Sequence, residues 1–370
     1  MPDSLFGKDS SFIIRSQLPF NGGPPPARAA RSFVTPVEDF FVRTHALEVP
    51  TVDVATFTLE VGGMVRAPLR LTLDELRSRF ATHQVAATMQ CAGNRRDQLM
   101  SVEPITGEVP WSIEAISNGV WEGVRLTDVL DAAGVDASRG ATDVEFIGLD
   151  QVERHGHTFG YGGSIPLDKA RADEVLIAWA MNGKPLEPVH GFPLRAVVPG
   201  YIGARNVKWL KQINVLDRPS ANFFQASAYK VFPPDVRAAT ADWNAATALG
   251  EFNISSAITS PEPGAKRAPG MTTVAGWAIG SAGNEIVRVE VSNDGGQSWA
   301  PAQVLDSRGQ SNAWTWRLWD ARLPLTPGEH QLVVRATDSA GKTQPAEAKA
   351  LWNFKGYMNN AWHRVHIAVR

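Results

Sequence analysis

The pattern of hydrophobic and polar positions divides the chain into three parts. Residues 1–40 include a proline-rich stretch at 19–36 whose composition cannot propagate a helix, so we expect an extended arm there. Residues 41–240 alternate between helical and strand patterns. Residues 241–370 show almost no helical periodicity and contain short strands separated by turn signals, which is typical of an immunoglobulin-like β-sandwich. The predicted fold is therefore an α+β domain followed by an all-β domain.

Local signals place the elements of the middle part. Thr72 and Glu75 match a capping box that begins a short helix running to about Phe80. Gly134 ends a helical stretch that starts at Leu126. Strands are predicted at Phe57–Val65, Gln84–Gln90, Val144–Leu149, Val175–Met181, Leu194–Val198 and Val207–Val215, with a hairpin turn at Asn182-Gly183.

The last third of the chain continues with strand and turn signals. Val287–Val291 alternates apolar and polar residues before a turn at Asn293–Gly296. Further strands are predicted at Ala313–Trp319 and Gln331–Ala336, with a turn at Pro327-Gly328 between them.

Composition agrees with a soluble protein of two domains. The chain has 370 residues, more than one ordinary core holds, and 44% of them are hydrophobic and 20% charged. The formal net charge of −2 gives no reason to expect a nucleic-acid partner. No run approaches the roughly 18 apolar residues of a membrane span. The start Met1–Leu5 lacks the pattern of a signal peptide, so we expect a cytoplasmic location.

Cys91 is the single cysteine of the chain. One cysteine excludes an intrachain disulfide, a zinc site of several cysteines and an iron–sulfur cluster held by this chain alone. The positive charges of Arg95 and Arg96 favour the thiolate, the form that binds metals or attacks electrophiles. The alternative is a small buried hydrophobe, as most free cysteines are. A nucleophile needs a nearby base, and a metal held by one protein thiolate needs its remaining ligands from a cofactor.

Four positively charged segments fall in predicted loops, at residues 40–45, 95–96, 190–195 and 203–208. Each segment alone is typical of a solvated surface. Together they bring arginine, histidine and lysine from separate parts of one domain, which suits a multiply anionic ligand. The common glycine-rich nucleotide loops are absent from the sequence.

The segment Met89–Arg96 resembles the cysteine loop of the sulfite oxidase family of molybdenum enzymes, which includes the molybdenum portion of eukaryotic nitrate reductase. The resemblance covers nearly the whole chain. Further segments follow in family order at Ile14–Pro25, Phe41–His45, Gly148–Asp150, Tyr161–Pro166, Met181–Gly183, His190–Lys208, Tyr229-Lys230 and Asn360–His366. It implies an α+β molybdopterin-binding domain over residues 41–240, followed by an immunoglobulin-like dimerisation domain over residues 241–370.

The resemblance also implies roles for single residues. Cys91 would be the sole protein ligand to molybdenum, with molybdopterin supplying two dithiolene sulfurs; soft thiolate ligation suits this metal site. The pterin and its phosphate would be held by Phe41, Val42, Arg43, Thr44, His45, Asp150, His190, Arg195, Asn206, Val207 and Lys208. The substrate pocket would be formed by Arg43, Arg96, Trp111, Tyr229 and Lys355.

Two residues depart from the family pattern. Lys355 stands where animal and plant sulfite oxidases have a substrate-binding arginine, and lysine keeps the charge but loses the planar fork. Thr44 replaces the usual asparagine beside Arg43, which is a smaller change.

The implied function is molybdenum-dependent oxidation of sulfite to sulfate by oxygen-atom transfer. No haem is expected in this chain, so an external acceptor, oxygen or a cytochrome, would take the electrons. A homodimer through the C-terminal domain is expected. One alternative is an enzyme of the same fold that acts on nitrate or another small oxyanion. The other is a catalytically silent assembly module that uses the sandwich to bind a partner.

Overall fold

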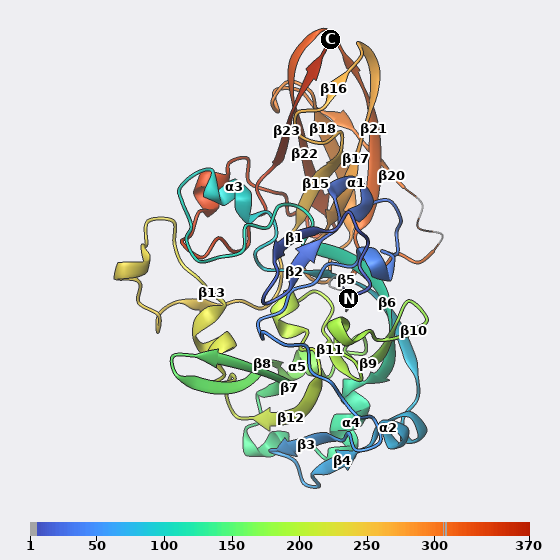
Figure 1. Cartoon of the computed structure of the whole chain (residues 1–370), viewed down its shortest axis with the longest axis vertical. Coiled ribbons are helices and arrows are strands. Elements are labelled where there is room, and N and C mark those ends of the chain that lie inside the picture. Colours follow the sequence, from blue (N-terminus) through green and yellow to red (C-terminus); the bar gives the residue numbers. More distant parts are fainter. Residues whose placement is uncertain (1–5, 306, 308) are drawn as a thin grey trace.

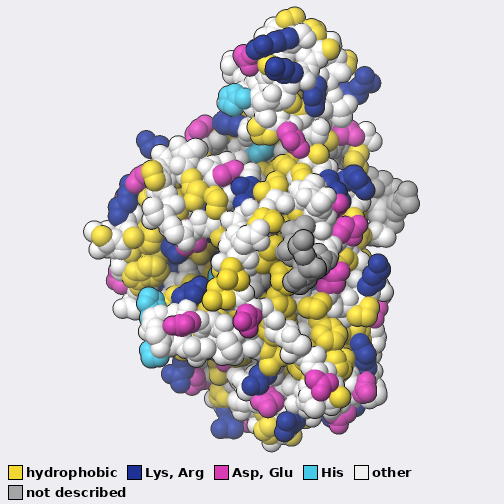
Figure 2. Space-filling model, in the orientation of Figure 1, with side chains coloured by type: hydrophobic (Ala, Val, Ile, Leu, Met, Phe, Trp, Pro, Cys, Tyr) yellow, Lys and Arg dark blue, Asp and Glu magenta, His cyan; other side chains and the backbone are white. Residues whose placement is uncertain are grey.

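The computed structural model describes residues 6–305, 307 and 309–370. Within these ranges two sheet-rich units lie end to end, with the C-terminal unit at the top of Figure 1. The face drawn in Figure 2 mixes acidic, basic and apolar side chains, in keeping with the small net charge. None of the helices in the described ranges has the length and apolar character needed to cross a lipid bilayer.

The first sheet of the lower unit delivers Cys91 to the interior. Its antiparallel strands run in the order β10, β9, β6, β5, and β11 pairs with β9. They are β5 (His83–Gln90), β6 (Ile116–Arg125), β9 (Leu176–Met181), β10 (Lys184–Pro185) and β11 (Arg195–Val197). Because β5 ends at Gln90, Cys91 begins the loop at the end of that strand.

The second sheet of the lower unit carries Asp150 and ends near Lys208. Its strand order is β4, β3, β12, β7, β8, and only β12 and β3 run parallel among these pairs. The strands are β3 (Leu59–Gly63), β4 (Leu69–Leu71), β7 (Asp143–Arg154), β8 (His157–Pro166) and β12 (Leu210–Leu216). Asp150 lies in β7 at a register shift against β8, where the ladder is irregular.

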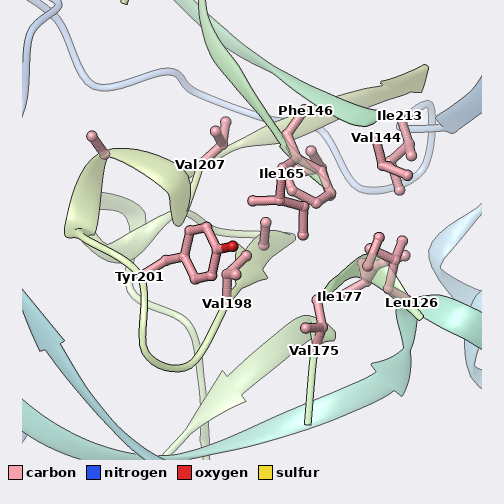
Figure 3. Close-up of a cluster of buried hydrophobic side chains, with 14 of the residues drawn as sticks. Leu126, Val144, Phe146, Ile165, Val175, Ile177, Val198, Tyr201, Val207 and Ile213 are labelled. Carbon is pink, nitrogen blue, oxygen red and sulfur yellow. The ribbon is translucent and has the colours of Figure 1, made fainter. Parts of the chain in front are cut away.

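The core of the lower unit lies between these two sheets. Val144 and Phe146 from β7 and Ile213 from β12 lie across from Ile177 of β9 in Figure 3. All of these side chains are at most 1% exposed. Burial of such aliphatic and aromatic side chains stabilises the fold by about 1.5–3 kcal/mol each. The sheets therefore fix the loops that leave their edges.

Short helices connect the strands, and their ends follow the sequence signals. The helices are α1 (Pro26–Ala29), α2 (Leu73–Arg79), α3 (Arg96–Met100), α4 (Leu126–Ala133) and α5 (Leu167–Ala170). The Thr72 hydroxyl accepts from the Glu75 backbone N–H at 3.2 Å, and the Glu75 carboxylate accepts from the Thr72 N–H at 2.8 Å, which confirms the capping box. Gly134 ends α4 at a φ of 69°, and Asn182 and Gly183 have positive φ in the β9–β10 turn.

The N-terminal arm is partly regular rather than wholly extended. Strands β1 (Ile13–Ser16) and β2 (Asn21–Gly23) form an antiparallel pair. The prediction that residues 19–36 hold no helix is wrong for the four residues of α1. Pro26 stands at the first helical position, where a missing N–H breaks no helical hydrogen bond, so the proline run begins a turn instead of preventing it.

The upper unit is a β-sandwich, which confirms the predicted all-β domain. One sheet has the order β15 (Ser255–Ser260), β17 (Gly270–Ile279), β21 (Arg317–Leu325) and β20 (Gln303–Val304). The other has the order β16 (Lys266–Arg267), β23 (His363–Val369), β22 (Gly328–Asp338), β18 (Ile286–Ser292) and β19 (Ala300–Pro301). A further small pair, β13 (Lys230–Val231) and β14 (Thr247–Ala248), lies in the connection between the units.

The strand predicted at 313–319 begins later than expected. Asn312 accepts from the Trp314 N–H at 2.7 Å through its side chain and from the Thr315 N–H at 3.2 Å through its carbonyl. These bonds form a local turn that competes with strand pairing, so β21 starts only at Arg317.

Arg95 joins the two units. Its side chain is fully buried and donates to the Ser256 carbonyl at 3.2 Å, to the Ala361 carbonyl at 2.5 Å and to Gln98 at 2.8 Å. Burial lowers the pKa of Arg95 to about 9. Thr88 adds a second connection, because its hydroxyl accepts from the Trp316 N–H at 2.8 Å. The units are therefore held together by buried polar contacts.

We predict that Arg95→Ala lowers the melting temperature by at least about 5 °C, because buried acceptors left without donors cost about 1–3 kcal/mol each. Scanning calorimetry measures the effect. Arg218→Ala is the matched control, since Arg218 is 78% exposed and pairs with its neighbour Asp217, and it should move the melting temperature by less than about 1 °C. Equal melting temperatures for Arg95→Ala and the unaltered chain would contradict the role of Arg95.

Candidate functional site

A pocket of about 690 Å³, part of it open to solvent, lies where the arm, both sheets of the lower unit and the connection to the sandwich meet. Many of the predicted cofactor residues line it together with Cys91 and Tyr229. The lining residues are Phe40, Phe41, Val42, Arg43, Thr44, His45, Met89, Cys91, Asp150, Tyr161, His190, Arg195, Gly203, Ala204, Asn206, Lys208, Trp209 and Tyr229.

Cys91 is held in the pocket wall by its backbone. Its N–H donates to the Ala115 carbonyl at 2.9 Å, and its carbonyl accepts from Asn94 at 3.0 Å. The sulfur accepts from the Gly93 N–H at 3.5 Å, and the side chain is 6% exposed. Gly203 packs against the backbone of Gln90 and Cys91. A Cβ added to Gly203 would lie 3.4 Å from the Gln90 carbonyl oxygen. The thiol therefore has a fixed position and reaches the pocket.

The two arginines after Cys91 form hydrogen bonds in different parts of the structure. Arg95 reaches into the contact between the units, and Arg96 donates to the carbonyls of Lys355 and Gly356 at 3.1 and 3.2 Å. Arg95 has a left-handed backbone with φ of 65°, which turns the chain between the two side chains. The expectation that both charges favour the Cys91 thiolate stays a prediction. Arg43 lines the same pocket as Cys91, and the charges of Tyr229 and Cys91 raise the pKa of Arg43 against the effect of its burial.

Buried cations surround the inner end of the pocket. Arg195 donates to the carbonyls of His190 and Asn206 at 3.0 and 3.1 Å, and burial lowers its pKa to about 9. Lys208 donates to the Thr44 hydroxyl at 3.1 Å and to the Val189 carbonyl at 3.0 Å. Burial, reinforced by Arg195, lowers the pKa of Lys208 well below its ordinary value. Carbonyl and hydroxyl oxygens thus satisfy these N–H groups without neutralising their charge.

Asp150 is the carboxylate that lines this pocket. It is 3% exposed, and its Oδ1 atom has no hydrogen-bond partner in the structure. Burial raises the pKa of Asp150 to about 6, and the nearby Lys208 charge opposes the shift. An oxygen that is buried, lines a cavity and lacks a donor is positioned to accept a hydrogen bond from a ligand N–H.

The arm adds a lysine that the sequence did not single out. The Lys8 Nζ atom lies 2.6 Å from His190 Nε2 and donates to the Val37 carbonyl at 2.6 Å. Burial lowers the pKa of Lys8 to about 8, although Glu187 opposes the shift. Burial and the charge of Lys8 hold the pKa of His190 well below its ordinary value. His190 is therefore neutral at neutral pH and accepts from Lys8.

A hydrogen-bonded chain runs along the outer side of the pocket. Arg43 donates to Asn21 at 3.0 Å and to the Thr44 carbonyl at 2.6 Å, and its Nη2 lies 3.2 Å from His45 Nδ1. His45 Nε2 lies 2.8 Å from the Tyr229 hydroxyl. Burial, reinforced by Arg43, lowers the pKa of His45 well below its ordinary value, and burial raises the pKa of Tyr229 to about 12. Both rings are neutral at neutral pH.

Four of the predicted residues are not among those that line the pocket. Val207 is 1% exposed and packs in the apolar core, where Figure 3 shows it near Tyr201, and its carbonyl accepts from Ala196 at 2.8 Å. Trp111 is fully buried in the apolar cluster that includes Cys91, and its indole N–H has no partner in the structure. Arg96 and Lys355 lie beside the pocket, where Glu108 pairs with both. Their predicted roles stay predictions.

Sequence reasoning assigned no role to six other lining residues, which are Phe40, Met89, Tyr161, Gly203, Ala204 and Trp209. Phe40, Met89, Gly203 and Ala204 lie within segments that the sequence analysis singled out, without a role of their own, and Trp209 lies outside those segments. Tyr161 begins the Tyr-Gly-Gly segment in the family order. Its hydroxyl donates to the Ala204 carbonyl at 3.1 Å, and its ring stacks on His45 with centroids 5.1 Å apart. The others contribute mainly shape, which no local motif records.

The pocket fits an anionic pterin cofactor on three observations. The Cys91 thiol lies in the wall, Asp150 is the carboxylate beside the cations Arg195 and Lys208 among the described lining residues, and Asp150 Oδ1 has no hydrogen-bond donor within the described ranges. A phosphate would relieve the buried positive charge, and a pterin ring N–H would satisfy the carboxylate. The residues present therefore suit molybdopterin, with the thiolate as ligand to the metal.

We predict that phosphate stabilises the cofactor-free protein. A concentration tenfold above its dissociation constant should raise the melting temperature by about 3 °C over sodium chloride of equal ionic strength. Arg195→Met should remove most of this rise because it deletes a buried donor to the anion, whereas Arg218→Ala at the surface should keep it. A rise of the same size in Arg195→Met would place the phosphate elsewhere.

Two family models match the chain in the order of its two units. The model described as "Oxidoreductase molybdopterin binding domain" matches residues 46–224. The model described as "Mo-co oxidoreductase dimerisation domain" matches residues 246–370. The two matches follow the order of the lower unit and the β-sandwich, while the lining residues 40–45 and Tyr229 lie outside the matched ranges.

Relatives and a solved structure agree with these matches. The sulfite oxidase of Gallus gallus is 44% identical over 356 residues, which cover 95% of this chain and 76% of that protein. The mitochondrial sulfite oxidase of Homo sapiens is 41% identical over 96% of this chain, which spans 65% of the human protein. The sulfane dehydrogenase SoxCD from Paracoccus pantotrophus has a similar structure, with a TM-score of 0.79 at 27% identity, covering 95% of this chain and 85% of that one.

The human relative is named a mitochondrial sulfite oxidase. The cytoplasmic location expected for this chain stays a prediction. The fold, the order of the domains and the molybdopterin site agree with one another. With 44% identity over 95% of its length to a sulfite oxidase, the chain belongs to the sulfite oxidase family of molybdopterin-dependent oxidoreductases.

Proposed function

We propose that this protein oxidises sulfite to sulfate with the molybdenum cofactor and passes the electrons to an external acceptor. The observation that carries the proposal is the chain from Arg43 through His45 to Tyr229, which lines the same pocket as the Cys91 thiol. A fixed cation and a fixed hydroxyl beside a metal-binding thiol suit a small oxyanion. The names of the relatives, two of them sulfite oxidases, support sulfite as that anion.

The hydrogen-bond pattern determines which groups can donate to an anion. A guanidinium only donates, so His45 Nδ1 must accept from Arg43 and the His45 proton lies on Nε2. Nε2–H then donates to the Tyr229 oxygen at 2.8 Å. This bond does not use the Tyr229 hydroxyl proton, and the Tyr161 side chain is a further hydrogen-bonding partner of the Tyr229 hydroxyl. The hydroxyl keeps that proton at neutral pH because burial raises its pKa to about 12.

Arg43 would hold the charge of the substrate. Burial alone would lower the pKa of Arg43, but Tyr229 and Cys91 outweigh this, and the resulting pKa is raised above its ordinary value. Asn21 and the Thr44 carbonyl fix the guanidinium through Nη1, which leaves the group charged and oriented. When bound at Cys91, the molybdenum cofactor would supply the two-electron redox chemistry and the transferable oxygen. The chain's own residues would hold the anion and fix its orientation in the pocket.

A homodimer through the sandwich and an acceptor such as oxygen or a cytochrome complete the proposal. The matched dimerisation domain supports the dimer. Because Lys355 replaces an arginine fork, an enzyme acting on nitrate or another small oxyanion is the competing function. Reduction of nitrate without turnover of sulfite would favour that competitor.

We predict that the purified protein contains close to one molybdenum per chain and reduces ferricyanide when sulfite is added. Cys91→Ser should lose this activity at least about a hundredfold while keeping its melting temperature within about 2 °C in the cofactor-free form, since serine is nearly isosteric. Less than about a tenth of a molybdenum per chain, from cells able to make the cofactor, would favour a catalytically silent assembly module.

We predict that Tyr229→Phe lowers kcat/KM for sulfite by about 10- to 100-fold, because it removes a hydrogen bond to a charged group worth about 1.5–3 kcal/mol. Steady-state kinetics with ferricyanide measure the change. Molybdenum content should stay the same, since the Tyr229 hydroxyl bonds to His45 rather than to the cations that suit the phosphate. Unchanged kcat/KM would remove Tyr229 from the substrate site.

A further inference from the structure

A carboxylate lies among the cations expected to bind the substrate. Glu108 forms an ion pair with the Lys355 ammonium, and its other oxygen lies 3.5 Å from Arg96 Nη2. Glu108 is only 15% exposed, Lys355 20% and Arg96 3%. These groups lie where helix α3 and the segment near residue 350 run side by side in Figure 1. No sequence motif contains Glu108.

Backbone carbonyls hold the Arg96 guanidinium with its Nη2 group towards Glu108. Its Nε donates to the carbonyls of Lys355 and Gly356, and Nη1 donates to the Val109 carbonyl at 2.7 Å. Gly356 lets the backbone approach, because an added Cβ would lie 2.6 Å from Arg96 Cγ. The Nη2 group of Arg96 lies 3.5 Å from the Glu108 carboxylate.

The pair is continuous with the pocket through aromatic rings. Arg96 lies over the Tyr357 ring at 5.0 Å, and Lys355 lies over the same ring at 5.8 Å. Tyr357 stacks on Tyr229 with centroids 5.3 Å apart and planes 20° from parallel. The Glu108 charge is close enough to act on the pKa of both Arg43 and Tyr229. Glu108 therefore lies at the substrate side of the site.

We propose that Glu108 is an internal counter-ion that occupies Arg96 and Lys355 before substrate binds and that an incoming oxyanion must displace. The proposal rests on the function proposed above. A carboxylate already paired with two cations neutralises part of their charge and lowers their affinity for a second anion. Lysine suits this exchange, because its ammonium is a point charge on a flexible stem and can leave one oxygen for another. Glu108 thus lowers the affinity of Arg96 and Lys355 for other anions.

The test compares Glu108→Gln with the unaltered holoenzyme. Sulfate binding measured by calorimetry and the KM for sulfite should each tighten about tenfold, because glutamine keeps the shape and removes the competing charge. Glu103→Gln is the matched control: Glu103 lies in the same loop, is 43% exposed and pairs with Arg237, so its sulfate affinity should change by less than about twofold. Weaker sulfate binding in Glu108→Gln would overturn the proposal and make Glu108 a positioning residue for Lys355.

A second variant separates this role from a general electrostatic effect. In a Lys355→Met background, Glu108→Gln should improve sulfate affinity by less than about threefold, since the displaced partner is gone. An undiminished tenfold gain there would contradict exchange at Lys355. Sulfate binding does not depend on turnover, so absence of sulfite oxidation with an intact Glu108 effect would fault the proposed function and not this inference.

Discussion

The burial of positive charge is the constraint on which the rest of this structure depends. Arg95 and Arg195 are buried and Lys208 is half-buried, and carbonyl, hydroxyl and amide oxygens accept hydrogen bonds from them. Groups of this kind lose hydration that neutral acceptors only partly replace, so the surrounding scaffold must hold the acceptors in place. Loops of the lower unit and the sandwich both contribute such oxygens. An anionic cofactor would relieve the remaining repulsion, which would couple cofactor binding to the stability of the pocket.

The contact between the two units is part of the site as well as part of the fold. The loop after Cys91 sends Arg95 into the sandwich and Arg96 towards residues 355–356. The C-terminal unit therefore contacts the pocket wall through Tyr357, whose ring stacks on that of Tyr229. The matched dimerisation domain thus also packs against the site of the same chain.

Rigid rings and fixed charges divide the pocket into two regions. The inner region holds Lys208, Arg195 and Asp150, which suit a phosphate and a pterin ring. The outer region holds His45 and Tyr229, which are neutral at neutral pH and are hydrogen-bonded to each other. Stacked aromatic groups keep these donors in place before any ligand arrives, which is the arrangement that favours electrostatic stabilisation of an oxyanion.

The sequence by itself determined the features whose causes are local. The capping box at Thr72, the helix end at Gly134 and the turn at Asn182-Gly183 each depend on a few adjacent residues, and the structure confirms them. The order of motifs brought Cys91 and most of the cofactor residues into one predicted site, and the pocket unites them. The turn at Asn312 was not predicted, and because of this turn β21 starts at Arg317 rather than at Ala313.

Only the tertiary structure decided where the long charged side chains point. Arg95 and Arg96 are neighbours in the sequence, yet one bonds to Ala361 and the other to Lys355. Glu108 belongs to no motif, and its importance comes from cations that the fold brings to it. The physical reason is that a charged side chain takes its direction from partners distant in the chain. A pattern of adjacent residues cannot encode those partners.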